Sequence, residues 1–248
     1  MTLTLEVCVD NFESVKATVD GGGKRVELCS SLLDGGLTPS IGLLKHVKKV
    51  YPSLVVFAMI RPRGGDFCYD SDELQIMASD IELLKEAGAD GFVFGCLTAD
   101  GSVDKKANSF LLKKSSPLPC TFHRAFDMTR EFQQSLESVI ELGFKRILTS
   151  GHAKNAADGI EEICQLVELA RGRIIIMPGS GVNASNLAAI LNQCKAREFH
   201  SSASALRDST MAYRNPKINM GSNSSEFAWK VAVVDKVREL IEISSKLH

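Results

Sequence analysis

The chain has 248 residues, of which 44% are hydrophobic and 24% charged, and its formal net charge is -1. This composition is typical of a folded globular protein, and the lack of a basic excess argues against nucleic-acid binding through bulk charge. No apolar run approaches the roughly 20 residues of a membrane span, and the first six residues lack the pattern of a secretion signal. We therefore expect a cytoplasmic protein, with the nucleus as an alternative location.

Eight short β-rich segments follow one another along the chain, and an amphipathic stretch separates most of them. Between strands, Leu74–Ala87 and Lys154–Arg171 show the apolar spacing of helices that bury one face. The expected strands are Leu3–Val9, Lys24–Cys29, Leu54–Arg61, Gly91–Cys96, Leu118–Arg124, Lys145–Ser150, Arg173–Pro178 and Arg197–Ser201.

This alternation predicts an α/β fold, a (β/α)8 TIM barrel that forms a single domain over residues 1–248, since such barrels take about 250 residues. The alternative is a doubly wound sheet, but no glycine-rich turn follows the first strand. The segment 206–225 breaks the rhythm and is rich in Ser, Asn, Arg and Met, so we expect a mobile loop there. The amphipathic stretch Glu226–Leu247 is predicted to be a C-terminal helix that closes the outer ring.

A Glu-x-Cys dyad occurs twice, at Glu6-Val7-Cys8 and at Glu27-Leu28-Cys29. Because strand side chains alternate, each glutamate points to the same face as its cysteine. If the two runs are neighbouring strands, two thiols and two carboxylates meet at one end of the barrel. Two thiolates suit a two-coordinate soft ion such as Cu(I) better than a zinc site, which wants four ligands. The alternative is that both cysteines are buried as small hydrophobic residues.

Further polar side chains stand at the predicted carboxyl ends of the strands, where barrel enzymes carry their active sites. Two histidines, His123 and His200, end the fifth and eighth strands. A glutamate could transfer a proton with His123 as partner, while two arginines hold an anion. The alternative is a network of salt bridges that fills the barrel mouth. The candidate catalytic residues are Glu6, Glu27, Arg61, His123, Arg124 and Asp127.

A glycine-rich turn, Gly179-Ser180-Gly181, follows the seventh strand. Glycines let backbone N–H groups approach an anion, and this part of a barrel is a usual place for a phosphate. With Ser150 and Gly151 after the sixth strand, the turn forms a candidate anion-binding site; a plain tight turn is the alternative. The residues thus also allow an enzyme that acts by acid–base chemistry on a small anionic or phosphorylated metabolite.

Seven phrases, in order along the chain, match one protein family: Glu6-Val7-Cys8, Arg25-Val26-Glu27-Leu28-Cys29-Ser30, Gly35-Gly36-Leu37-Thr38-Pro39-Ser40, Met59-Ile60-Arg61-Pro62-Arg63-Gly64-Gly65-Asp66-Phe67, Asp90-Gly91-Phe92-Val93-Phe94-Gly95, Thr121-Phe122-His123-Arg124-Ala125-Phe126-Asp127 and Leu148-Thr149-Ser150-Gly151. Through these phrases the chain resembles the CutC copper homeostasis proteins along nearly its whole length. The resemblance implies a (β/α)8 barrel, an intracellular homo-oligomer (dimer or tetramer) and a role in copper homeostasis, with Cu(I) bound at Cys8 and Cys29. The strand-seven turn departs from the family pattern, because Ser180 replaces the middle of three glycines.

Overall fold

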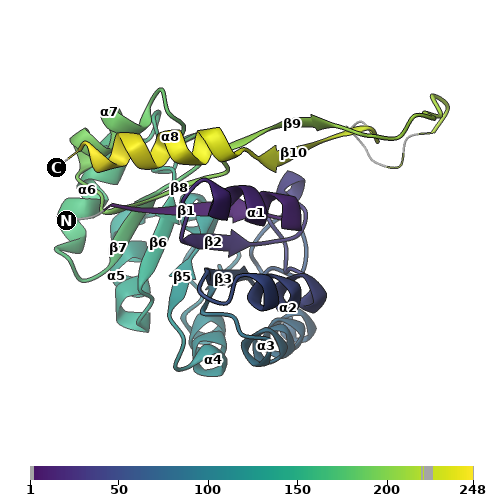
Figure 1. Ribbon diagram of the computed structural model, residues 1–248. Helices are drawn as coiled ribbons and strands as arrows, with labels where there is room; N and C mark the ends of the chain where they lie inside the picture. The colour runs from purple at the N-terminus through teal and green to yellow at the C-terminus, as the bar shows by residue number, and fades with distance from the viewer. Residues whose placement is uncertain (1–2, 219, 221–225, 248) are drawn as a thin grey trace.

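The computed structural model describes residues 3–218, 220 and 226–247, and its centre is a sheet of eight parallel strands (Figure 1). The strands pair in the order β7-β6-β5-β4-β3-β2-β1-β8, and β7 lies beside β8, which brings the two ends of the sheet together into a barrel. The predicted barrel and all eight of its strands are confirmed. The strands are β1 (Thr4–Val9), β2 (Arg25–Leu28), β3 (Val55–Met59), β4 (Gly91–Phe94), β5 (Cys120–Phe122), β6 (Arg146–Thr149), β7 (Ile175–Pro178) and β8 (Glu198–Ser201).

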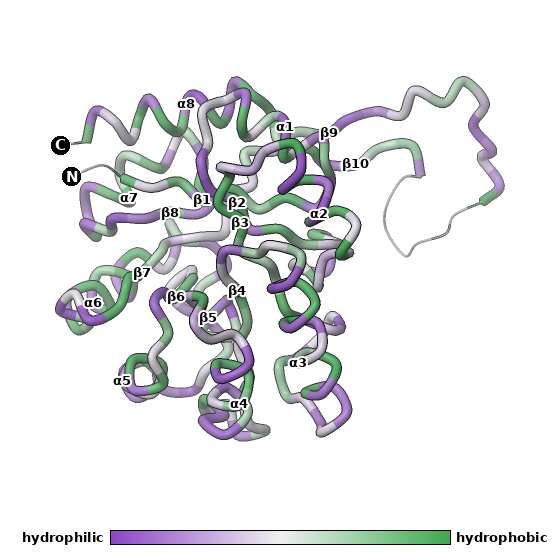
Figure 2. The backbone as a smooth tube through the Cα atoms, turned by 60° about the horizontal axis from the view of Figure 1, so that its bottom comes forward, coloured by the Kyte–Doolittle hydropathy of each residue, from purple (hydrophilic) through white to green (hydrophobic). Residues whose placement is uncertain are grey.

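The helices surround the strands and cover the outer face of the barrel (Figure 2). None of those among the described residues combines the length and the apolar character that a membrane span requires. The α-helices are α1 (Phe12–Asp20), α2 (Ile41–Val50), α3 (Ser71–Glu86), α4 (Lys105–Ser115), α5 (Phe132–Leu142), α6 (Ile160–Ala170), α7 (Leu187–Cys194) and α8 (Val234–Ser245), and two short 3-10 helices are η1 (Leu32–Asp34) and η2 (Arg124–Met128).

Helix α3 shows how the local sequence sets these helices. The side chain of Asp70 accepts hydrogen bonds from the N–H groups of Asp72 and Glu73, and Glu73 reaches back to the N–H of Asp70, which forms a capping box. One face of the helix then buries Met77 and Ile81 against the barrel. The helix predicted over residues 74–87 is therefore confirmed, and it begins three residues earlier because the cap adds a turn.

Alternation along the strands separates an apolar outer face from a polar interior. Val7 and Leu28 are fully buried in the core that the helices share with the barrel. Glu6 and Glu27, one residue earlier on each strand, are 0% and 3% exposed and take the opposite face, inside the barrel. Carboxylates are rarely buried unless they are paired, so the interior of this barrel is specialised.

A β-hairpin stands outside the barrel between β8 and α8. Its strands, β9 (Ser204–Asp208) and β10 (Ala228–Ala232), are antiparallel, and the hairpin projects beyond the body of the protein (Figure 1). The prediction of a helix from residue 226 was wrong for β10, because residues 228–232 pair with β9 instead. Within the predicted loop 206–225, residues 206–208 belong to β9, and residues 219 and 221–225 lie outside the described residues.

Candidate functional site

Three neighbouring strands bring a thiol, a carboxylate and an imidazole together at the barrel mouth. In the strand register Cys8 of β1 stands opposite Glu27 of β2, and Glu6 of β1 stands opposite His200 of β8. One potential ligand atom each of Cys8, Glu27 and His200 lies within 4.8 Å of the other two. Sulfur, oxygen and nitrogen donors at this spacing are able to share one metal ion.

The glutamate and the histidine of this group are already paired. Nε2 of His200 lies 2.9 Å from Oε2 of Glu27, and both side chains are buried. Burial disfavours the charged imidazolium, but the facing carboxylate of Glu27 outweighs it, so the pKa of His200 is raised. His200 is therefore held by a carboxylate, as histidines in metal and acid–base sites usually are.

A buried ion network lies below this pair in the barrel interior. The guanidinium of Arg25 contacts both Glu6, at 2.8 Å, and Glu198, and Arg146 lies 2.7 Å from Glu198. The two guanidinium groups also stack on the ring of Phe57, at 5.8 and 4.9 Å from its centre. A salt-bridge network, the alternative interpretation of these polar residues, thus describes the floor of the site. The mouth above it holds the group of Cys8, Glu27 and His200.

The two cysteines of the repeated dyad have different surroundings. Cys8 is partly accessible, whereas Cys29 is fully buried in a small apolar cluster with Phe57, Met59 and Val93. Burial raises the pKa of both thiols well above the usual value, and the carboxylate of Glu27 raises it further. Each thiolate therefore needs a nearby cation.

His123 faces the mouth from the end of β5 as a neutral imidazole. Burial and the positive charge of Arg61 lower its pKa to about 3. Its Nδ1 accepts a hydrogen bond from the N–H of Ala125, so Nε2 carries the proton. The ring packs edge-on against Phe67, 4.7 Å between centres. In this state His123 is a hydrogen-bond donor and not a base.

Arg61 is placed as an anchor of two loops. Its guanidinium donates hydrogen bonds to the carbonyl oxygens of Asp34, Gly36 and Gly65, and it stacks on the ring of Phe67 at 5.0 Å. These contacts hold the loops after β2 and β3 over the barrel. Most of its donors are thereby engaged, so its predicted role in holding an anion would need a rearrangement of these loops.

Asp127 joins η2 to the end of β6. Its carboxylate accepts hydrogen bonds from the N–H and the hydroxyl of Ser150, at 3.0 and 2.9 Å, and lies 2.7 Å from Nε of Arg124. Arg124 also donates to the hydroxyl of Ser150, while the N–H of Gly151 donates to Thr149. The N–H groups proposed for an external anion are thus directed at groups of the protein itself.

The turn after β7 keeps some backbone donors free. Ser180 and Gly181 have φ angles of 70° and 73°, and their N–H groups make no hydrogen bond within the described part of the chain. The hydroxyl of Ser180 donates to the carbonyl of Lys154. A Cβ on Gly179 would come within 2.4 Å of Leu148 and 3.3 Å of His200, so glycine is required where this turn passes the site.

Several buried polar atoms at the mouth or inside the barrel have no hydrogen-bond partner among the described residues. Leaving such atoms unpaired costs free energy unless a ligand, an ion or water satisfies them. The barrel interior is therefore a candidate binding site. The atoms are Oε1 of Glu6, Oε1 of Glu27, Oγ1 of Thr121, Nε2 of His123 and Nη1 of Arg146.

Sequence reasoning missed three charged residues of the network, Arg25, Arg146 and Glu198. The available signal was their place inside β-rich segments, where a charged side chain is unusual. Arg25 and Glu198 fall at the starts of strands as the structure has them, and Arg146 also begins its strand. Charged residues are common at strand ends that contact solvent. The charges of these three residues therefore did not indicate that they lie inside the barrel.

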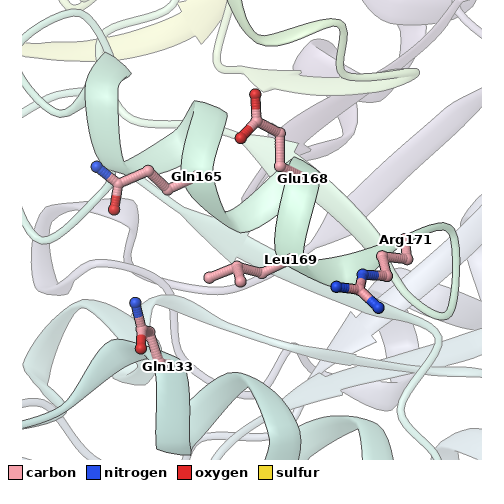
Figure 3. A pocket seen from close by; sticks show the side chains of 5 residues that line it. All are labelled: Gln133, Gln165, Glu168, Leu169 and Arg171. Atoms are coloured by element: carbon pink, nitrogen blue, oxygen red, sulfur yellow. The ribbon is translucent and has the colours of Figure 1, made fainter.

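A separate groove of about 320 Å³ lies on the outside of the barrel between α5 and α6 (Figure 3). Gln133 of α5 faces Gln165 and Leu169 of α6 across it, with Glu168 and Arg171 nearby. No residue of the predicted site lines this groove.

Comparison with known proteins identifies the family. The model of the CutC family matches residues 3–205. The chain belongs to the CutC family. Two proteins named copper homeostasis protein cutC homolog are 49% identical over 242 residues, from Mus musculus, and 48% identical over 245 residues, from Homo sapiens. These alignments cover 97% and 98% of this chain and 89% of each relative.

Solved structures agree with this membership of the CutC family. The putative copper homeostasis protein CutC from Streptococcus agalactiae is 36% identical, with a TM-score of 0.77, and the match covers 81% of this chain and 98% of that one. A thiamine phosphate pyrophosphorylase from Pyrococcus furiosus has a TM-score of 0.60 at 14% identity, covering 99% of this chain and 96% of that one, and shares the fold alone. The CutC family model ends within β9, so most of the projecting hairpin lies beyond it.

Proposed function

We propose that this protein acts in copper homeostasis by binding a copper ion at the barrel mouth, with the thiolate of Cys8 as a ligand. The observation that carries the proposal is the convergence of donor atoms from Cys8, Glu27 and His200 within 4.8 Å. Thiolate and imidazole are preferred copper ligands, and the names of the mouse and human relatives refer to copper homeostasis. These residues therefore fit a copper ion. The repeated dyad names Cys29, the residue after β2, as a candidate second thiolate, and the Cys29→Ser variant decides whether copper binding needs it.

Titration of the full-length protein with Cu(I) against a competing chelator tests this function. We expect one copper ion per chain in the unmodified protein and loss of that ion in Cys8→Ser. Cys164→Ser, which changes a thiol on the outer helix α6, is the matched control and should bind copper normally. Equal copper binding by Cys8→Ser and the unmodified protein would contradict the proposal.

A second candidate function is an enzyme that acts by acid–base chemistry on a small anionic or phosphorylated metabolite. It is favoured by the unpartnered buried atoms of Glu6, Thr121 and Arg146, which copper binding leaves unexplained. Glu27, His123 and the strand-seven turn would line the same mouth. We expect inorganic phosphate or a sugar phosphate to raise the melting temperature of the protein. No shift across a panel of such compounds would count against this candidate.

We also propose that the protein is a cytoplasmic homo-oligomer, a dimer or tetramer. The projecting hairpin supports an association, because a two-stranded ribbon is marginally stable by itself and this one exposes many apolar side chains. Sedimentation velocity measures the mass directly, and a monomer at micromolar concentration would contradict this part of the proposal. The exposed apolar residues of the hairpin and its connecting segment are Leu206, Met211, Tyr213, Ile218, Met220 and Trp229.

A further inference from the structure

We infer that the metal ion at the mouth is held by the mixed donor set of Cys8, Glu27 and His200, and that Cys29 is not a ligand. This inference rests on the proposed function, because it assumes that the mouth binds a metal ion. It differs from a two-cysteine site in its donor atoms, and therefore in the ions that it accepts and in the residues on which binding depends.

The register of three strands brings the donor atoms of Cys8, Glu27 and His200 together. β1 lies between β8 and β2, and Cys8 stands directly opposite Glu27. Donor atoms that share one ion at about 2.0–2.3 Å are at most about 4.6 Å apart. The 4.8 Å limit that encloses the atoms of Cys8, Glu27 and His200 is thus close to a bound arrangement, and small side-chain rotations complete it.

The position of Cys29 sets its sulfur apart from this donor group. The N–H of Cys29 donates to the carbonyl of Val9, so Cys29 lies beyond the end of β1, about 6.6 Å further along its strand than Glu27. Its sulfur is enclosed by the apolar cluster and by Gly36, where an added Cβ would lie 3.0 Å from Sγ. No atom of Cys29 belongs to the donor group found among the described residues. Its surroundings are those of a packed hydrophobic residue.

The carboxylate of Glu27 also favours the mixed donor set. This side chain is 3% exposed; Oε2 contacts His200, and Oε1 is buried without a hydrogen-bond partner in the described part of the chain. A buried carboxylate oxygen is expected to be satisfied. A cation between Cys8 and His200 satisfies it, whereas a two-coordinate Cu(I) ion between two sulfurs leaves it unpaired.

The donor chemistry then indicates the class of ion. One thiolate, one imidazole and one carboxylate form a borderline set that suits divalent ions such as Cu(II) or Zn(II), while Cu(I) prefers softer, all-sulfur surroundings. Three protein ligands also leave a fourth position open, as in sites where a bound metal contacts a small molecule. The site is therefore suited to a divalent transition ion with one exchangeable position.

Titration of the full-length, metal-free protein with Co(II) under anaerobic conditions tests the donor set, because the absorption spectrum reports sulfur ligation and tetrahedral geometry independently of any activity. We expect one Co(II) per chain with a thiolate charge-transfer band. Cys8→Ser should lose the band, and Glu27→Gln and His200→Gln should each bind at least tenfold more weakly. Cys29→Ser is the matched control and should keep both the band and the affinity.

Loss of the charge-transfer band in Cys29→Ser, with unchanged binding in Glu27→Gln and His200→Gln, would overturn the inference, as would the absence of Co(II) binding. Glu27→Asp keeps the charge while shortening the side chain, and circular dichroism of each variant shows whether it is folded. The Cu(I) titration of the proposed function separates the two ideas. Copper binding that needs Cys8 and Cys29 but not Glu27 or His200 would support the proposed function and contradict the mixed donor set. Co(II) binding without copper binding would support the mixed donor set and contradict the proposed function.

Discussion

Nε2 of His200 at the end of β8 lies 2.9 Å from Oε2 of Glu27 on β2, so the two side chains meet across β1. Burial alone would lower the pKa of His200, and the carboxylate of Glu27 is what raises it. We expect Glu27→Gln to lower the pKa of His200 below that in the unmodified, metal-free protein. Titration of the imidazole resonances by NMR measures this change, with His152, which pairs with Glu162, as the internal control. An unchanged pKa of His200 would show that Glu27 does not hold it.

The buried network on the barrel floor predicts a large loss of stability when Glu198 is neutralised. Glu198 faces Arg25 and Arg146 and is 8% exposed, so Glu198→Gln leaves two buried guanidinium groups with too little negative charge. We expect the free energy of unfolding in urea to fall by about 3–5 kcal/mol. Glu13→Gln breaks the exposed pair with Arg207 and serves as the control with little change. A similar, small effect in both variants would mean that the network contributes little.

The neutral state of His123 predicts a pH dependence of stability. Its pKa is lowered to about 3 in the folded protein, whereas an unfolded histidine binds a proton near pH 6.5. The unfolded state binds the proton at a higher pH than the folded state, so a falling pH favours unfolding. The contribution of His123 to stability is therefore present above pH 6.5 and is lost as the pH falls below it. Between pH 7.5 and 5 this loss is about 2 kcal/mol.

Urea unfolding at the two pH values measures that loss. His123→Asn keeps a side-chain acceptor for the N–H of Ala125 but has no group that titrates in this range, so its stability should fall less between pH 7.5 and 5 than that of the unmodified protein. Parallel pH profiles of the two proteins would contradict the prediction.

The close approach of the strand-seven turn predicts that Gly179→Ala disturbs the site. The new methyl group would lie 2.4 Å from Cδ1 of Leu148 and 3.3 Å from Cβ of His200, so both side chains must move. We expect a loss of about 1–3 kcal/mol in stability and weaker metal binding. The control is Gly42→Ala in helix α2, where the nearest atom is 4.0 Å away and alanine favours the helix by about 0.5–1 kcal/mol. Normal metal binding by Gly179→Ala would show that the turn does not position His200.

The barrel itself could be predicted from the sequence because alternating strands and amphipathic helices are local patterns. The cap of α3 depends on residues within a few positions of one another along the chain. The shared face of Glu6 and Cys8, and of Glu27 and Cys29, likewise depends only on alternation within one strand. The hairpin after β8 could not be predicted in this way. Residues near 228–232 satisfy a helical spacing, and only their pairing with β9 makes them a strand.

The sequence by itself determined which side chains face the barrel interior, since alternation along a strand depends on nothing beyond the strand. It did not determine their height along the barrel axis, because that depends on how far each strand is shifted against its neighbour when the sheet closes. The tertiary structure decided that Cys8 stands opposite Glu27, while Cys29 lies beyond the end of β2. It also decided that β8 closes against β1, which brings His200 to the site from the other end of the chain.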